Sequence, residues 1–342
     1  MRIAQVAPLM ESVPPRLYGG TERIVSYLTE ELVRQGHQVT LFASGDSVTQ
    51  AELVPCTKGA LRLDPKVKDP LLHHVIEIDQ VRRRAHEFDV LHFHMDYLHF
   101  PLFRAAGRDT VTTMHGRLDL PDFMPLFAAF PEMPLVSISD HQRRPLPHLR
   151  WLRTIHHGLP EDLYPFAAAS KGEYLAFLGR ICPEKRPDRA IEIARRAGMP
   201  LRIAAKVDRV DETYFAEVVQ PLLRDPLIEF IGEIGEAEKA AFLSGARAVL
   251  FPIDWPEPFG LVMIEAMACG TPVIAYRCGS VPEVVEDGVT GYIVDSIEGA
   301  VAAVDRLGAL DRALIRRRFE DRFSAERMAR DYLAVYQGSQ SM

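Results

Sequence analysis

The sequence lacks any long hydrophobic run. No stretch approaches the roughly 18 apolar residues that a membrane-spanning helix needs. The first ten residues, MRIAQVAPLM, carry one basic residue and are soon followed by Glu11 and two prolines. This start is typical of a first β-strand and not of a signal peptide. We therefore expect a cytoplasmic protein.

Cysteine and basic charge are also scarce. The four cysteines show no C-x-x-C spacing and are too few for a disulfide framework in 342 residues, so we expect reduced thiols. Lys and Arg number 40 against 47 Asp and Glu, a net charge of −7. A nucleic-acid-binding protein needs a basic surface to displace counterions from phosphates, and this balance argues against that class.

Two common motifs are missing. No G-x-G-x-x-G follows the first predicted strand, which argues against a dinucleotide-dependent dehydrogenase. No D-x-D occurs, and the nearest acidic pair, Glu77 and Asp79, lies in a predicted helix. His92 and His94 would point to one face of a strand, with Asp96 close by, but no ligand set of known spacing emerges. We expect no metal and no cofactor.

Length and composition suit two globular domains. Hydrophobic residues make up 47% and charged residues 25% of the chain. Residues 1–160 carry 18 basic and 18 acidic residues, whereas the rest carry 22 and 29, and all 12 histidines lie between His37 and His157. This break predicts a first domain over 1–160, a second over 161–323, and a terminal helix and tail over 324–342.

Both halves alternate short apolar strands with helix-length segments. In the first half a helix with Ile24, Val25, Leu28 and Leu32 inward ends at Gly36. This alternation predicts an α/β fold of two Rossmann-like domains, each with a parallel sheet, facing across a cleft. The last helix is a candidate to pack back on the first domain. The predicted strands are 2–7, 39–43, 89–94, 110–115 and 134–139, then 174–179, 201–205, 228–232, 248–252, 272–276 and 291–294.

The strongest motif is WPEPFGLVMIEAMACGTPVIA, residues 255–275. Glu257 precedes a helix predicted to begin near Phe259 or Gly260, and Glu265 lies on its core-facing stripe with Leu261, Ile264 and Ala268. A buried carboxylate needs hydrogen-bond donors, and ribose hydroxyls are suitable. The alternative is a plain buried helix in which Glu265 pairs with a local arginine. The first amides of the helix favour sugar and phosphate oxygens; they belong to Phe259, Gly260, Leu261 and Val262.

The run EPFGLVMIE resembles the E-x7-E motif of retaining glycosyltransferases of family 4, which have the GT-B fold. The resemblance covers most of the chain and is densest over 172–294. It implies that Glu257 contacts the donor sugar and Glu265 the nucleotide ribose. Pro258 lies within the same donor-binding segment. Transferases of the other main fold hold a metal with D-x-D, so its absence here indicates a metal-independent enzyme.

Two further segments contribute candidate site residues. Arg180 and Lys185 follow the first strand of the second half, where two cations suit a diphosphate; the alternative is a solvated basic loop. Gly19 and Gly20, in the run Tyr18 to Glu22, would let backbone amides approach a phosphate or an acceptor, or simply form a tight turn. His115 matches the family's strand-end histidine, which approaches the donor sugar.

Together these features predict transfer of a hexose from a nucleoside diphosphate sugar to an acceptor hydroxyl, with retention of configuration. UDP-glucose is weakly preferred over GDP-mannose on family frequency. The alternatives are a sugar-nucleotide epimerase or a phosphorylase on the same fold, and a non-catalytic sugar-nucleotide-binding protein. The basic runs at Arg82–Arg84 and 141–153 are candidates for peripheral membrane contact, or are solvated surfaces.

Overall fold

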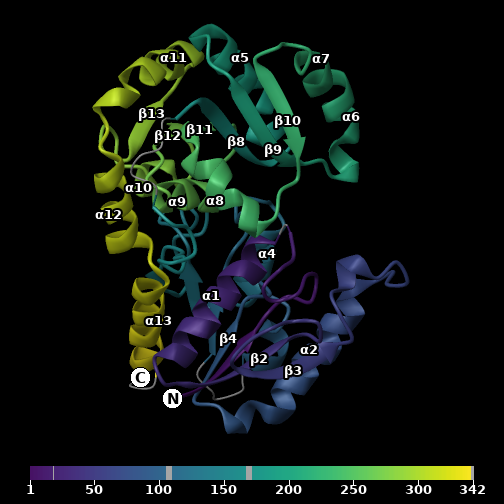
Figure 1. Ribbon diagram of the computed structural model, residues 1–342. Helices are drawn as coiled ribbons and strands as arrows, with labels where there is room; N and C mark the ends of the chain where they lie inside the picture. The colour runs from purple at the N-terminus through teal and green to yellow at the C-terminus, as the bar shows by residue number, and fades with distance from the viewer. Residues whose placement is uncertain (18, 105–109, 167–171, 340–342) are drawn as a thin grey trace. The chain divides into compact units, whose positions relative to one another are not determined.

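The computed structural model describes residues 1–17, 19–104, 110–166 and 172–339. The chain forms two units: the first comprises Met1–Pro160 with Ala325–Met342, and the second Glu161–Ser324. Each is a parallel sheet with helices around it, so the predicted α/β class with two Rossmann-like domains is confirmed (Figure 1). No described helix is long and apolar enough to cross a membrane.

The first unit is built on a seven-stranded sheet in the order β3-β2-β1-β4-β5-β6-β7. All its pairs are parallel, and the order reverses between β1 and β4. In open α/β sheets ligands bind beyond the carboxyl ends of the strands at such a reversal. The strands are β1 Arg2–Val6, β2 Gln38–Ser44, β3 Glu52–Thr57, β4 Val90–Phe93, β5 Thr110–Thr113, β6 Leu135–Ser137 and β7 Trp151–Thr154.

Helices α1 (Gly20–Arg34) and α13 (Ala325–Ser339) pack side by side in the first unit (Figure 1). The predicted inward residues of α1, from Ile24 to Leu32, are fully buried. In α13 the buried residues Met328, Tyr332 and Tyr336 fall four positions apart, and Ala329 three before Tyr332, so all lie on one face of the helix. The other helices of this unit are α2 Pro70–Arg84, α3 Phe100–Phe103 and α4 Phe123–Ala129, with 3-10 turns at Leu61–Leu63 and Ala85–Glu87.

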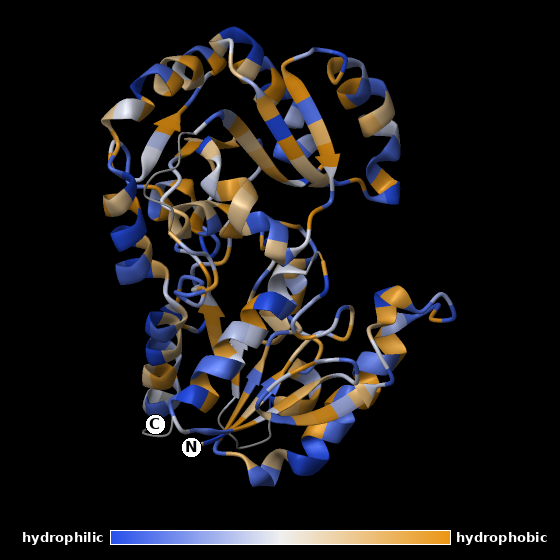
Figure 2. Cartoon of the chain, in the orientation of Figure 1, coloured by the Kyte–Doolittle hydropathy of each residue, from blue (hydrophilic) through white to orange (hydrophobic). Residues whose placement is uncertain are grey.

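The second unit repeats this topology with a six-stranded parallel sheet in the order β10-β9-β8-β11-β12-β13. Its order reverses between β8 and β11. The edge strand β10 carries both hydrophilic and hydrophobic residues (Figure 2). The strands are β8 Tyr174–Arg180, β9 Leu201–Lys206, β10 Ile228–Gly232, β11 Ala246–Phe251, β12 Val273–Tyr276 and β13 Gly291–Val294.

On one face of this sheet, a hydrophobic core packs α5 and α11 against the strands and against each other. The helices are α5 Pro187–Ala197, α6 Glu212–Tyr214, α7 Gln220–Leu222, α8 Glu236–Ser244, α9 Leu261–Ala268, α10 Val281–Val284, α11 Ile297–Arg306 and α12 Arg312–Phe323. A π-helical turn spans Phe215–Val219, and 3-10 turns span Pro183–Lys185, Arg209–Asp211 and Leu307–Ala309.

Candidate active site

Lys185 and Glu257 form an ion pair in the second unit. Lys185 ends the 3-10 turn after β8, and Glu257 lies in the loop after β11, so the pair stands where the strand order reverses. The indole nitrogen of Trp255 also donates to Glu257, at 3.0 Å. Lys185 Nζ lies 5.2 Å from the Trp255 ring centroid and 5.5 Å from that of Phe251. Aromatic faces and a carboxylate therefore hold this ammonium at the strand ends.

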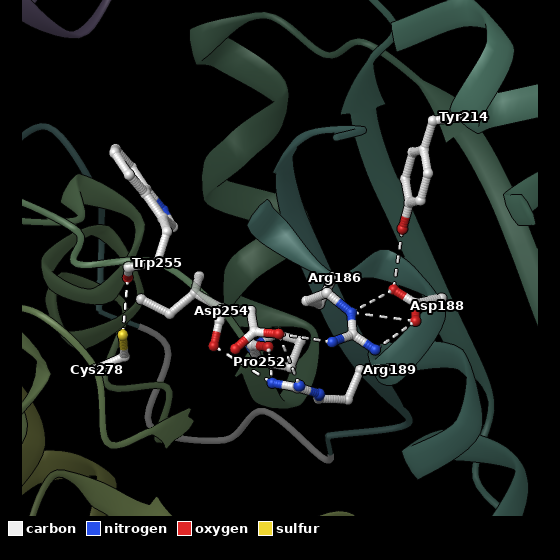
Figure 3. Close-up of polar contacts among 9 residues, drawn as sticks. Arg186, Asp188, Arg189, Tyr214, Pro252, Asp254, Trp255 and Cys278 are labelled. Carbon is white, nitrogen blue, oxygen red and sulfur yellow. Dashed lines mark hydrogen bonds and ion pairs between the residues drawn. The ribbon is translucent and has the colours of Figure 1, made fainter. Parts of the chain in front are cut away.

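The turn that presents Lys185 is fixed by its neighbour Arg186. Arg186 adopts a left-handed conformation, φ 53° and ψ 54°, which is uncommon for a non-glycine residue. Its guanidinium bridges Asp188 and Asp254 at 2.8 Å each (Figure 3). Burial alone would raise the pKa of Asp188, but hydrogen bonds from Arg186 and Tyr214 lower it. These bonds offset the strain of the turn and hold α5 to the loop after β11.

The backbone around Glu257 is held by the loop after β12. Ser280 donates its amide to the Glu257 carbonyl at 3.0 Å and its hydroxyl to the Phe259 carbonyl at 2.6 Å. Gly279 has φ +59°, and a Cβ there would lie 2.4 Å from both Glu257 N and O. The Cys278 thiol donates to the Trp255 carbonyl at 2.9 Å (Figure 3). Sequence reasoning missed this support, although a glycine three residues after a buried strand was a usable signal.

Gly260 is required by its own conformation and by packing. It has φ +82°, and a Cβ would meet Met263 Cε at 2.8 Å and Phe251 Cζ at 3.0 Å. The helix α9 begins one residue later, at Leu261, so the predicted start near Phe259 or Gly260 is corrected by one or two positions. The amides of Leu261 and Val262 fall in its first turn, where helical geometry leaves N–H groups without helical partners.

The environment of Glu265 differs from the predicted stripe. Every residue of α9 from Met263 to Ala268 is buried, whereas Leu261 is only half-buried, so the apolar surface runs around the helix. Glu265 is 4% exposed and pairs with Lys239 at 2.9 Å. The Tyr164 hydroxyl lies 3.4 Å from the same carboxylate. Glu265 is thus paired with a lysine from α8, whereas the alternative hypothesis of a plain buried helix predicted a local arginine.

Arg180, the last residue of β8, lies among three carboxylates. Its nitrogens are 3.5 Å from Asp211, 3.6 Å from Asp208 and 3.9 Å from Glu184. Burial raises the pKa of Asp211 even though Arg180 acts to lower it. These distances exceed those of a bidentate arginine–carboxylate fork. Electrostatic attraction holds Arg180 at the strand end, and because these contacts are long, another anion can compete with the carboxylates for its guanidinium.

The first unit brings histidines together at the ends of β4 and β5. His94 Nδ1 lies 2.9 Å from His115 Nε2, and the rings of His92 and His94 are 4.0 Å apart on one face of the sheet, as period-2 spacing predicts. The His157 ring stacks on His115 at 5.3 Å. Burial lowers the pKa of His115 to about 3, so its imidazole is neutral. Nowhere in the described ranges do three or more His, Cys, Asp or Glu residues form a group that could hold a metal.

Gly19 and Gly20 stand at the start of α1, in the first unit. Gly19 has φ 161° and ψ 81°, and a Cβ there would lie 2.8 Å from Pro15 Cβ. The preceding Tyr18 lies outside the described residues. The first turn of α1 contains Glu22, whose pKa is raised chiefly by burial. Burial thus favours the neutral form of this carboxyl group, which lies near the positive end of the helix dipole.

Comparison with known proteins identifies the class. The family model for group 1 glycosyl transferases matches residues 162–320, and the model for glycosyltransferase family 4 matches residues 18–168. The chain belongs to the family 4 glycosyltransferases, enzymes that transfer sugars. Its fold is GT-B, the fold of the solved glycosyltransferases that it matches along its whole length.

Relatives and structural neighbours agree on this class. The chain is 28% identical to a phosphatidyl-myo-inositol mannosyltransferase from Mycolicibacterium smegmatis, over 89% of this chain and 84% of the relative. It is 39% identical to a D-inositol 3-phosphate glycosyltransferase from Nocardia farcinica, over 42% of this chain and 34% of the relative. The structure of a sucrose-phosphate synthase from Thermosynechococcus elongatus superposes with a TM-score of 0.80 at 20% identity, covering 100% and 99% of the two chains.

Proposed function

We propose that this chain transfers a hexose from a nucleoside diphosphate sugar to an acceptor hydroxyl, with retention of configuration and without a metal. The Lys185–Glu257 pair carries the proposal. In the absence of donor the two charges neutralise each other beside Trp255. When a donor binds, its diphosphate competes for Lys185, and the released Glu257 carboxylate accepts hydrogen bonds from sugar hydroxyls.

The other candidate residues have matching roles in this proposal. Arg180 gives up its loose carboxylate contacts for the phosphates, and the amides from Phe259 to Val262, after Pro258, bind sugar and phosphate oxygens. Glu265 accepts hydrogen bonds from the ribose. His115 bonds a sugar hydroxyl, while Gly19 and Gly20 let backbone amides approach phosphate or acceptor. Resemblance to the family supports same-face attack, in which a β-phosphate oxygen takes the acceptor proton and the protein stabilises the departing diphosphate.

The donor is proposed as UDP-glucose first and GDP-mannose second. An Anabaena protein, HepE, has been solved in complex with UDP and glucose; it is 18% identical, with a TM-score of 0.74, and covers 99% of this chain and 100% of its own. The M. smegmatis relative is named a mannosyltransferase. The two names point to different donors, which keeps both sugars in the panel that tests the proposal.

The test is a panel of nucleotide sugars incubated with the purified chain, with and without EDTA. We expect one donor to be converted to free nucleotide, with no loss on chelation, and the product anomer from NMR to match the donor. Loss of activity in EDTA would contradict metal independence, and an inverted anomer would contradict retention. If no nucleotide sugar bound, the central proposal would fail.

The same panel separates the alternatives. An epimerase converts the donor with no acceptor present, and a phosphorylase needs phosphate. A non-catalytic binding protein binds a nucleotide sugar in thermal shift but releases no nucleotide. Lys185→Ala is the diagnostic variant, because in a transferase it lowers turnover, whereas in a binding protein it only weakens binding.

We also propose peripheral membrane contact, through α2. The predicted basic run is largely committed to ion pairs, since Arg82 and Arg83 bind Asp79 and Arg84 binds Glu87. In the run 141–153, Arg143 binds Asp140. Five exposed apolar residues instead gather at the start of α2 and just before it, where Figure 2 shows mixed hydropathy. They are Leu63, Leu71, Leu72, Val75 and Ile76, each about half exposed or more.

Charge is balanced at that place. Lys66 and Lys68 are exposed in the segment between Leu63 and Leu71, and so are Asp64 and Asp69, so the apolar residues carry this proposal. We expect the purified chain to float with anionic vesicles at low salt, and Leu72→Glu with Ile76→Glu to abolish flotation. Arg83→Glu, a charge change at the other end of the same helix, is the matched control and should retain binding. Flotation unchanged by the double variant would contradict this surface.

A further inference from the structure

Seven side chains of the first unit form one continuous row of hydrogen bonds, here called the polar row. It runs from α13 to the end of β5, and six of the seven side chains are buried. The bonds are Tyr332–Thr113 at 2.8 Å, Thr113–His92 at 2.7 Å, His92–Tyr336 at 2.7 Å, Tyr336–Gln5 at 3.2 Å, Gln5–His94 at 2.7 Å and His94–His115 at 2.9 Å.

The Gln5 side chain gives the row a direction. Its amide nitrogen donates to the Tyr336 hydroxyl, and its oxygen lies 2.7 Å from His94 Nε2. An amide oxygen only accepts, so His94 Nε2 carries the proton. Burial lowers the pKa of His94 well below its ordinary value, so this ring is neutral and has one N–H. His94 Nδ1 is therefore an acceptor, and His115 Nε2 donates to it.

The same reasoning fixes the second nitrogen of His115. A neutral ring that carries its proton on Nε2 has a lone pair on Nδ1, and the pKa of His115, held at about 3 by burial, keeps the ring neutral. No described residue donates to this buried Nδ1 atom. Turning the Gln5 amide around would reverse the bonds to His94 and His115 and place the proton on Nδ1. The amide of Gln5 thus determines which kind of ligand atom His115 can bind.

We propose that Gln5 is a positioning residue that acts through His94 to present His115 Nδ1 as a hydrogen-bond acceptor. Such a nitrogen binds a hydroxyl group of the ligand and rejects phosphate and carboxylate oxygens, which only accept. The identity of that hydroxyl, a sugar's, rests on the proposed function. The proton position on His115 does not, because it follows from contacts within the first unit alone.

The direct test is 15N NMR of the full chain labelled at histidine, with the His115 signals assigned as those lost in His115→Asn. We expect a protonated Nε2 and a bare Nδ1. A proton on Nδ1 would overturn the proposal, but it would not contradict the proposed transferase function. Gln5→Met should leave His115 a mixture of both forms, whereas Gln5→Glu, which keeps an acceptor for His94, should retain the wild-type form.

Tyr332→Phe is the matched control, since it deletes a buried hydroxyl from the same row at its far end. It should leave the His115 form unchanged, and an equal change in Tyr332→Phe and Gln5→Met would mean general loosening and overturn the role of Gln5. With the best donor of the panel, Gln5→Met should lose about two- to twelvefold in kcat/KM, the value of one neutral hydrogen bond, and Gln5→Glu should recover it. Full activity in Gln5→Met would overturn the role in binding. A chain inactive with every donor would refute the proposed function and leave the NMR result standing.

Discussion

Glu77 is an acid buried without a partner, and its removal should stabilise the first unit. It lies on α2, is 0% exposed, and neither carboxylate oxygen has a hydrogen-bond partner among the described residues. Burial raises its pKa well above the ordinary value. Folding therefore favours the protonated form of this group, whereas the unfolded chain releases the proton above the ordinary glutamate pKa.

The magnitude follows from linkage. Above the ordinary glutamate pKa of about 4.3 the unfolded chain is ionised while the folded one stays protonated, so stability falls as pH rises towards the folded pKa. The slope is about 1.4 kcal/mol per pH unit for one proton. In Glu77→Met this dependence disappears and the thioether fills the space. Between pH 5 and pH 6 the gain in the free energy of unfolding should grow by up to about 1.3 kcal/mol.

The chain offers a specific probe for this measurement. It has two tryptophans, Trp151 on β7 of the first unit and Trp255 in the second. In a Trp255→Phe background, urea unfolding followed by fluorescence reports on the first unit alone. The control is Ile76→Met, which replaces an exposed neighbour on the same helix, removes no titratable group and should give a flat difference across pH. A Glu77→Met difference that is also flat would refute the reasoning.

Three other predictions follow from the site and the histidines. Lys185→Ala should lower kcat by about 10²- to 10³-fold in a nucleotide-release assay, because a cation at the leaving diphosphate is lost, and Lys185→Arg should not fully restore it. Gly279→Ala should destabilise the second unit by several times the roughly 1 kcal/mol expected for Gly36→Ala in the first unit. Both glycines have positive φ, but only at Gly279 would a Cβ clash with backbone atoms. Equal losses in the free energy of unfolding would contradict this prediction. Acid should weaken the first unit selectively, because burial depresses the pKa of His92 and His115, whose unfolded forms protonate near 6.5. Stability that is present above that pH is therefore lost below it, by up to about 1.4 kcal/mol per pH unit for each histidine. Hydrogen exchange at pH 7 and pH 5 should show the change in β4 and β5, and parallel changes in the second unit, which has no histidine, would argue against this prediction.

The repeated strand and helix pattern was predictable because buried elements leave strong sequence signals. The parallel strands have near-continuous apolar runs, and α1 has an inward face at helical spacing. Two strands were missed, β3 at Glu52–Thr57 and β7 at Trp151–Thr154. Both lie at the edges of the first sheet and are only half-buried, and β3 contains a proline, so neither shows the apolar run on which the prediction relied.

Sequence motifs identified the candidate residues of the site, but they could not predict which residues these contact. Pairing of Lys185 with Glu257 depends on β8 lying beside β11, a contact between segments 72 positions apart. The need for glycine at position 260 comes from Phe251 and Met263, which local sequence does not place against it. The polar row needed α13 to be located on β4 and β5 before its histidines could be connected.

The division of the chain also has a consequence for biosynthesis. The first unit is completed by α13, so the whole second unit lies as an insertion between two parts of one fold. At 5–20 residues per second, the ribosome needs roughly 10–40 s to make residues 161–342. During that time His92 and Thr113 lack the tyrosine hydroxyls that α13 brings to them. Those polar groups of the nascent first unit stay hydrated until then, and their burial is a late docking step that follows synthesis of the second unit.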